Sequence, residues 1–179
     1  ITHHPPTFTP RTPTYTIHSN WDVCKGGSSD ALAESLSLKV MSTFDIATGI
    51  GRICSCYKTL DEILDIVSNR FNEENTRVVN GQNGEKEVKK IAIVAGFGLN
   101  NLDYIKLAKD RSVDVFISGD LTHESGILAE KLNLTLIDIT HHYSEIPGLY
   151  VLADLISTLG VPVEVIDYGV PWDYIKNLR

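Results

Sequence analysis

The sequence of 179 residues lacks several features that define whole classes of protein. No apolar run approaches the roughly 20 residues that a membrane-spanning helix needs, which argues against an integral membrane protein. Basic residues are scarce, with 16 Lys and Arg against 23 Asp and Glu, and the net charge of −7 argues against nucleic-acid binding as the main function. The three cysteines are too few for a disulfide scaffold, so we expect reduced thiols in a cytoplasmic protein.

What is present is the composition of an ordinary folded domain. Apolar residues make up 42% of the chain and charged residues 22%, which excludes collagen-like, disordered and coiled-coil proteins. The chain opens at Ile1 without an initiator Met. Because Ile-Thr-His-His-Pro-Pro resembles the exit of a buried strand, we expect an N-terminally incomplete copy of a longer protein.

Hydrophobic periodicity predicts strands that alternate with helices. Strand patterns occupy residues 15–17, 91–95, 113–117, 134–139 and 161–166, and a further strand follows the turn at 49–53. Helix patterns begin at Ser28 or Ser29, at a capping box formed by Thr59 and Glu62, near Leu102 and Ile127, and shortly before Pro147. This alternation predicts an α/β fold of mixed sheets with helical layers.

A polar stretch with two Asn-Gly steps interrupts the pattern between residues 72 and 90. Such a stretch is typical of a domain boundary or a hairpin. We therefore expect two similar α/β halves that share a metal site. The N-terminal half, itself incomplete, spans 1–71, the polar connection 72–90, and the C-terminal half 91–179.

Two short motifs receive structural interpretations. Gly96-Phe97-Gly98 follows a predicted strand but is not part of a complete phosphate-binding loop, which indicates a tight strand-to-helix turn. Cys54 and Cys56 alternate along a strand, and no further cysteine completes a metal site around them. We therefore predict that both thiols pack in the core.

Four of the six histidines occur in two adjacent pairs, His3-His4 and His141-His142. Each pair comes directly after a predicted strand, where α/β folds place their ligand sites. A single histidine at such a place is most often a hydrogen-bonded surface residue. Two pairs at strand ends, each with an acidic residue nearby, favour a metal site.

The accompanying carboxylates are Asp22, four residues after His18, and Glu145, four residues after His141. If residues 141–145 open a helix, His141 and Glu145 lie on one face with Cβ atoms roughly 5–6 Å apart, which suits a shared metal. An ion pair between residues four apart explains the same spacing without a metal. The spacing alone does not decide between a shared metal and an ion pair.

The pairing of histidines also bears on the number of ions. Adjacent side chains in extended backbone point apart, so two ions accommodate His3 and His4 more easily than one. A carboxylate such as Glu145 can bridge two ions about 3.5–4 Å apart. The residues thus favour a dinuclear site, and imidazole with carboxylate but no thiolate suits zinc, iron, nickel or manganese.

Four stretches carry a family resemblance in the same order. They are Ile-Thr-His-His-Pro at 1–5, Ile-His-Ser-Asn-Trp-Asp at 17–22, Gly-Ile-Gly-Arg at 49–52, and a C-terminal signature of 118–123 and 138–145. Together they resemble the NIF-three-like family of dinuclear-metal hexameric proteins, also labelled GTP cyclohydrolase 1 type 2 homologues. The family has a helix between the first two stretches, so we expect either that this helix is deleted here or that residues are missing between about Thr9 and Thr14. We also expect the family's N-terminal strand-helix unit to be missing from the sequence.

The resemblance implies roles for particular residues. It implies a bridging role for Glu145 within the metal-ligand set His3, His4, Asp22, His141 and Glu145. It also implies that His18 steadies Asp22 or a bound water, and that His123 faces the metal cavity as a catalytic group that moves protons or contacts the substrate. A cap of its helix or a pair with Glu124 would explain His123 without catalysis. His142 stands where the family has an aromatic residue and stays outside the ligand set.

The resemblance further implies two divalent metal ions per chain, a small-molecule, nucleotide-like substrate such as GTP, hydrolytic chemistry and a homo-hexamer. The rival from another class is a metal-dependent binding or regulatory protein without turnover, which would use the same ligands. A purely structural metal ranks lower, because five ligands from three distant segments are unusual for a closed structural site.

Overall fold

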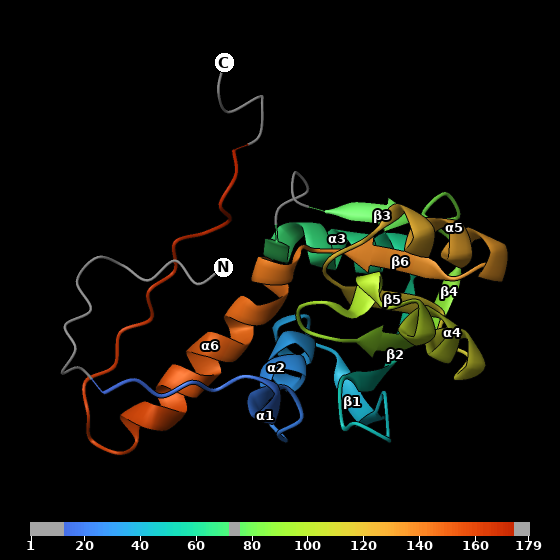
Figure 1. The fold of residues 1–179 in the computed structure, drawn as a ribbon. Coiled ribbons are helices and arrows are strands. Elements are labelled where there is room, and N and C mark those ends of the chain that lie inside the picture. The colour runs from blue at the N-terminus through green and yellow to red at the C-terminus, as the bar shows by residue number, and fades with distance from the viewer. Residues whose placement is uncertain (1–12, 72–75, 174–179) are drawn as a thin grey trace.

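The computed structural model describes residues 13–71 and 76–173 (Figure 1), so the predicted ligands His3 and His4 lie outside the described residues. Its centre is a six-stranded mixed sheet in the order β1-β2-β4-β5-β6-β3. The strands are β1 (Lys39–Thr43), β2 (Arg52–Thr59), β3 (Arg77–Val79), β4 (Glu87–Ile93), β5 (Val115–Ser118) and β6 (Thr135–Asp138). The predicted α/β class with a mixed sheet is confirmed.

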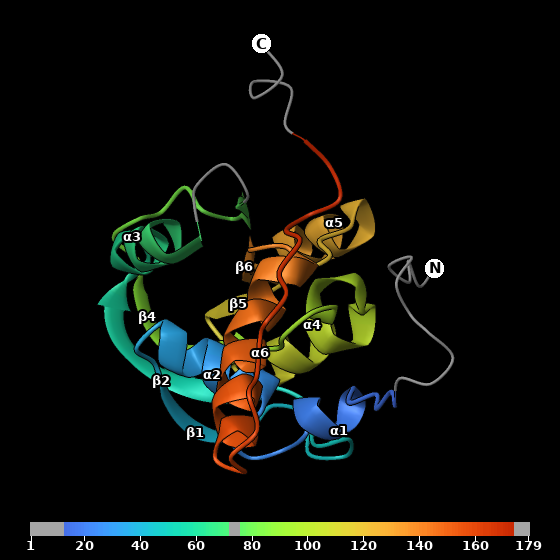
Figure 2. The same ribbon diagram turned by 90° about the vertical axis from the view of Figure 1, so that its left-hand side faces the viewer.

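Helices cover both faces of the sheet (Figure 2). They are α1 (Ser19–Asp22), α2 (Ser28–Ser35), α3 (Leu60–Phe71), α4 (Leu102–Asp110), α5 (His123–Leu132) and α6 (His141–Ser157), with a 3-10 turn at Gly98–Asn100. Side chains of α2 and α3 form one buried core with one face of the sheet. Side chains of α4 and α5 form the core on the other face. The predicted helical layers are therefore present.

Local sequence patterns predicted how some of these elements begin and pack. The backbone N–H of Thr59 donates to Glu62 Oε2 at 2.8 Å, and the N–H of Glu62 donates to Thr59 Oγ1 at 3.3 Å, which is the predicted capping box of α3. Cys54 and Cys56 are buried free thiols in the first core, as predicted. Burial raises the pKa of the Cys54 thiol to about 12, so this thiol stays protonated.

The direction of the strands decides where a site can form. β4, β5 and β6 run parallel, whereas β1 and β2 are antiparallel to their neighbours. The carboxyl ends of the three parallel strands therefore meet at one edge of the sheet. The turns that leave this edge carry Gly96, Gly119 and Thr140. In α/β folds this edge is where ligands bind.

The polar connection contributes to the sheet. Within 72–90, β3 crosses to the far edge and pairs antiparallel with β6, with Arg77 opposite Asp138. Strands from both sides of this connection share one sheet. The division into domains at 1–71, 72–90 and 91–179 stays a prediction.

Two strand predictions were wrong. Residues 15–17 and 161–166 are irregular, and most of their apolar side chains are exposed, Tyr15 by 82% and Ile166 by 62%. A strand needs a neighbouring strand to bond its N–H and C=O groups, and neither segment has one among the described residues. Alternating apolar and polar side chains produced the strand pattern, but no strand in the described part of the chain pairs with either segment.

The long helix α6 begins at His141, with Pro147 in its second turn as expected. It crosses α2 so closely that a Cβ on Gly148 would lie 2.9 Å from the Cα of Ser28. Its far end leaves the body of the protein, and Leu155 and Leu159 are 56% and 77% exposed there (Figure 1). No helix in the described part of the chain is both long and apolar enough to cross a membrane.

Candidate metal centre

Two glycines at the ends of β4 and β5 make room for the start of α6. Gly96 has φ +79°, and a Cβ there would lie 2.8 Å from Glu145 Oε1 and 3.1 Å from His141 Nε2. A Cβ on Gly119 would overlap the backbone N of His141. Only glycine at both positions lets the side chains of α6 come this close to the strand ends.

Ser144 then fixes the first turn of α6 to this edge. The side chain of Thr140 caps the helix by accepting from the N–H of Tyr143. Ser144 Oγ donates to the carbonyl of His141 at 2.7 Å and accepts the N–H of Gly96 at 2.7 Å. Since Ser144 is fully buried, the turn that carries His141 is held against the β4 turn.

The imidazole of His141 lies between two carboxylates. Its Nδ1 is 2.9 Å from Asp120 Oδ2, and its Nε2 is 3.3 Å from Glu145 Oε1. The hydrogen bond with Glu145 is the main cause that raises the pKa of His141 from its ordinary 6.5 to about 9, against the effect of burial and with help from Asp120. The predicted helical spacing thus does bring His141 and Glu145 together.

Asp22 approaches the same pair from α1, far away in the sequence. Partial burial is the main cause that raises the pKa of its carboxyl group, and the negative charge of Glu145 raises it further. A hydrogen bond from Ser28 and the charges of His18 and His141 act in the opposite direction. The charge of Asp22 is therefore coupled to the His141–Glu145 pair at the strand ends.

The loop after Asp22 is held by Arg52, the last residue of the Gly-Ile-Gly-Arg turn. The Arg52 guanidinium donates to the carbonyls of Cys24 and Gly51, both at 2.8 Å, and forms an ion pair with Asp30 at 2.8 Å. Arg52 is buried. It therefore ties the segment that follows Asp22 both to the sheet and to α2.

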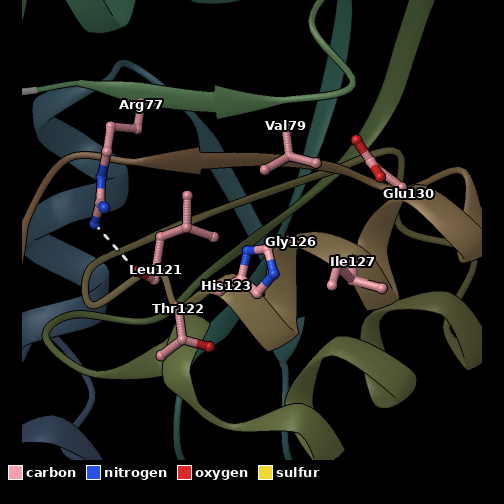
Figure 3. Close-up of a pocket in the computed structure, with 8 residues that line it drawn as sticks. All are labelled: Arg77, Val79, Leu121, Thr122, His123, Gly126, Ile127 and Glu130. Atoms are coloured by element: carbon pink, nitrogen blue, oxygen red, sulfur yellow. Dashed lines mark hydrogen bonds between the residues drawn. The ribbon is translucent and has the colours of Figure 1, made fainter.

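The other histidines lie elsewhere. His142 Nε2 is 3.1 Å from Asp167 Oδ1, a contact within ion-pair distance that lacks the angles of a hydrogen bond. His123 lines a pocket beside β3 with Arg77 (Figure 3), and its role as a proton-transfer group stays a prediction. His18 is exposed at the start of α1, close enough to affect the charge of Asp22.

Known proteins share this arrangement of sequence and fold. Residues 11–169 match the family model described as Duf34/NIF3 (NGG1p interacting factor 3). The chain belongs to the DUF34/NIF3 family. The resemblance to the NIF-three-like family is thereby confirmed.

Relatives within the DUF34/NIF3 family are similar over most of the chain. A GTP cyclohydrolase 1 type 2 homolog of Methanothermobacter thermautotrophicus is 44% identical over 172 residues, 96% of this chain and 72% of that protein. One of Methanocaldococcus jannaschii is 36% identical over 145 residues, 80% of this chain and 57% of that protein. The solved structure of reduced HcgD from Methanocaldococcus jannaschii has a TM-score of 0.71 at 35% identity, covering 80% of this chain and 56% of that one.

The residues of this DUF34/NIF3 chain fit a metal ion in their chemistry. Within residues 13–71 and 76–173, no group of three His, Cys, Asp or Glu side chains stands close enough together to hold a metal ion. His141 and Glu145 do lie together where Gly96 leaves space, and the charges of both affect the pKa of Asp22, which burial mainly raises. Oxygen and imidazole donors around an anionic centre suit a divalent cation.

Sequence reasoning had missed Asp120, Ser144 and the second role of Gly96. Asp120 has φ +65° and orients His141, as second carboxylates commonly do for metal-binding histidines. Its place two residues after β5 was a usable signal, because it lies at the same strand-end edge as His141. Ser144 and Gly96 carry no such signal, since their contact depends on how α6 meets β4.

Proposed function

We propose that this protein binds two divalent metal ions per chain and is a metal-dependent hydrolase of a small, nucleotide-like substrate, of the GTP cyclohydrolase type. The observation that carries the proposal is the contact of His141 with Glu145 at the carboxyl ends of the parallel strands, with the charge of Asp22 coupled to both. The proposal for the substrate is supported by the name of the relatives, GTP cyclohydrolase 1 type 2 homolog.

The charges at the site support a cation. Burial is the main cause that raises the pKa of the Asp22 carboxyl group, and the charge of Glu145 raises it further. In the metal-free protein the imidazole of His141, whose pKa is raised to about 9, supplies one positive charge beside Glu145. A divalent ion would replace that proton and bring a second positive charge, which favours the ionised form of Asp22.

Each residue has a proposed task. Asp22, His141 and Glu145 would hold the metal, with Glu145 as the bridge, and His3 and His4 are proposed as the remaining ligands. Asp120 binds His141 Nδ1 and thereby directs Nε2 toward Glu145. When bound, a pair of divalent ions lowers the pKa of water and stabilises negative charge that develops on the substrate.

Glu145→Gln tests the bridge. The substitution keeps the shape of the side chain but removes the charge, so both ions should be lost together, as measured by metal analysis and anomalous scattering. Glu124→Gln is the matched control, because Glu124 is exposed at the start of α5 and this substitution removes the same charge. A variant that keeps both ions, or loses only one, shows that Glu145 is not the bridge.

Turnover against a panel of nucleotides tests the reaction. The metal-loaded protein should hydrolyse at least one member, and Glu145→Gln should abolish that activity. A protein that binds two ions and turns over none of the panel would favour the binding or regulatory alternative. We also propose a homo-hexamer, which light scattering of the protein in solution tests independently.

A further inference from the structure

A second pocket lies between the edge strand β3 and α5, with a volume of about 420 Å³ (Figure 3). This volume lies within the range of small-molecule sites. Its polar side chains are Arg77, His123, Thr122 and Glu130, and its apolar side chains are Val79, Leu121 and Ile127. None of the tasks proposed for the metal centre uses Arg77 or Glu130.

One face of α5 builds the wall of this pocket. The lining residues of the helix are His123, Gly126, Ile127 and Glu130, a spacing of three, four and seven residues that places all of them on one side. At 1.5 Å per residue, His123 and Glu130 stand about 10 Å apart along the helix. The pocket is therefore elongated, with different chemistry at its two ends.

Gly126 keeps the middle of the pocket open. A Cβ at this position would have its nearest neighbour, Val79 Cγ2, at 3.8 Å, an ordinary contact. A helix that only needed to pack against β3 would be more stable with alanine here, by about 1 kcal/mol. The absence of a side chain at Gly126 thus leaves about the room of one methyl group in front of Val79, and a larger side chain here would project into the pocket.

One end of the pocket carries the Arg77 guanidinium, which an ion pair holds in place. Arg77 Nε donates to Asp138 Oδ2 at 2.8 Å, and its Nη2 donates to the same oxygen and to the carbonyl of Leu121. Asp138 is fully buried, which fixes the guanidinium while 61% of the Arg77 side chain stays exposed. His123, which has no hydrogen-bond partner among the described residues, lies between Arg77 and Glu130 (Figure 3).

We propose that this pocket binds an elongated organic anion about 10 Å long. Its oxyanion, a phosphate or a carboxylate, contacts Arg77 and His123. Its apolar body lies against the wall formed by Gly126, Val79 and Ile127, and its far end donates N–H groups to Glu130. A carboxylate accepts two such hydrogen bonds and so selects a ring that presents adjacent N–H donors.

The pocket adjoins the candidate metal centre but does not require it. Leu121 lines the pocket, and the preceding residue, Asp120, binds His141. The proposal rests on the proposed function only if the ligand is also the substrate. Binding is therefore measured separately from turnover.

The experiment titrates the protein with guanosine monophosphate, followed by amide NMR shifts and calorimetry. This probe carries a phosphate at one end and adjacent N–H donors at the other. The largest shifts should fall on residues 77–79 and 121–130. Pteroate has a similar N–H edge but carries a carboxylate in place of the phosphate. The probe that binds more tightly therefore identifies which oxyanion the pocket prefers. Failure of both probes to bind overturns the proposal.

Three variants test the three parts of the pocket. His123→Ala and Glu130→Gln should each weaken guanosine monophosphate about tenfold or more, because each removes a hydrogen bond to a charged group. Gly126→Met should fill the middle of the pocket and abolish binding. The matched control Glu124→Gln removes an exposed charge from the same helix and should bind as the unmodified protein does.

Glu145→Gln separates the pocket from the metal centre. Binding that survives Glu145→Gln and is lost in Gly126→Met supports the pocket, whether or not the protein is a hydrolase. Binding that is lost in Glu145→Gln and survives in Gly126→Met assigns the probe to the metal centre and overturns the proposal.

Discussion

Gly96→Ala is the most direct test of the geometry of the candidate metal centre. The new Cβ would lie 2.8 Å from Glu145 Oε1 and 3.1 Å and 3.2 Å from the Nε2 and Cε1 atoms of His141. Real Cβ atoms do not come within 3.0 Å of a neighbour, so the Glu145 carboxylate has to move. The substitution therefore acts on the two side chains proposed to share an ion without removing either one.

The expected effect has two separable parts. Alanine at φ +79° is strained by about 1–2 kcal/mol, because its Cβ approaches the following carbonyl. The contact with Glu145 adds little to the loss of stability, since a side-chain end can rotate away. The rotation displaces a proposed ligand, so the metal affinity should fall roughly tenfold or more, which corresponds to about 1.4 kcal/mol or more of binding free energy.

Gly26→Ala separates these parts. Gly26 also has φ +79°, but a Cβ there meets nothing within 4 Å, so this variant has the same backbone strain without the contact. Urea unfolding should lower the stability of both variants by a similar amount. Zinc titration by calorimetry should weaken binding only in Gly96→Ala. Equal zinc affinity in the two variants would refute the proposed role of His141 and Glu145.

Two further predictions concern the frame of the site and its charge. Arg52→Met should lower the free energy of unfolding by about 3–5 kcal/mol in urea, because it leaves the partly buried Asp30 without its ion pair; a loss below about 1 kcal/mol would contradict this. In metal-free protein, the raised pKa of His141 stabilises the fold below pH 6.5, and this stabilisation should disappear as the pH rises through about 9. The pH dependence of unfolding should be weaker in His141→Gln, and an unchanged dependence would show that another group is responsible.

Local sequence signals predicted the parts of the fold that depend on near neighbours. The capping box of Thr59 and Glu62 needs only residues three apart, and it was found from the sequence. The approach of Glu145 to His141 needs only one helical turn, and the spacing predicted it. Both predictions hold because the interacting groups belong to the same helix end.

The parts that were not predictable depend on pairing between distant segments. The apolar alternation at 161–166 satisfies the strand pattern, yet the segment has no strand partner within the described residues and stays irregular. The prediction that Asp22 and Glu145 belong to one site came from the family resemblance, because no periodicity links α1 to α6. The sequence predicts Gly96 as part of a turn, which the structure confirms. Its contact with α6 could not be predicted, because it depends on how this helix meets the ends of the strands.

The buried carboxylate of Asp138 joins the pocket to the candidate metal centre. Its Oδ2 binds Arg77, and its Oδ1 accepts the N–H of Thr140 at 2.9 Å, the residue that caps the helix carrying His141. Removing Arg77 would leave a buried charge without its partner and would also loosen this cap. Variants of Arg77 would therefore disturb both the pocket and the candidate metal centre. Variants of His123 and Glu130 alter only the pocket and leave the bonds of Asp138 in place.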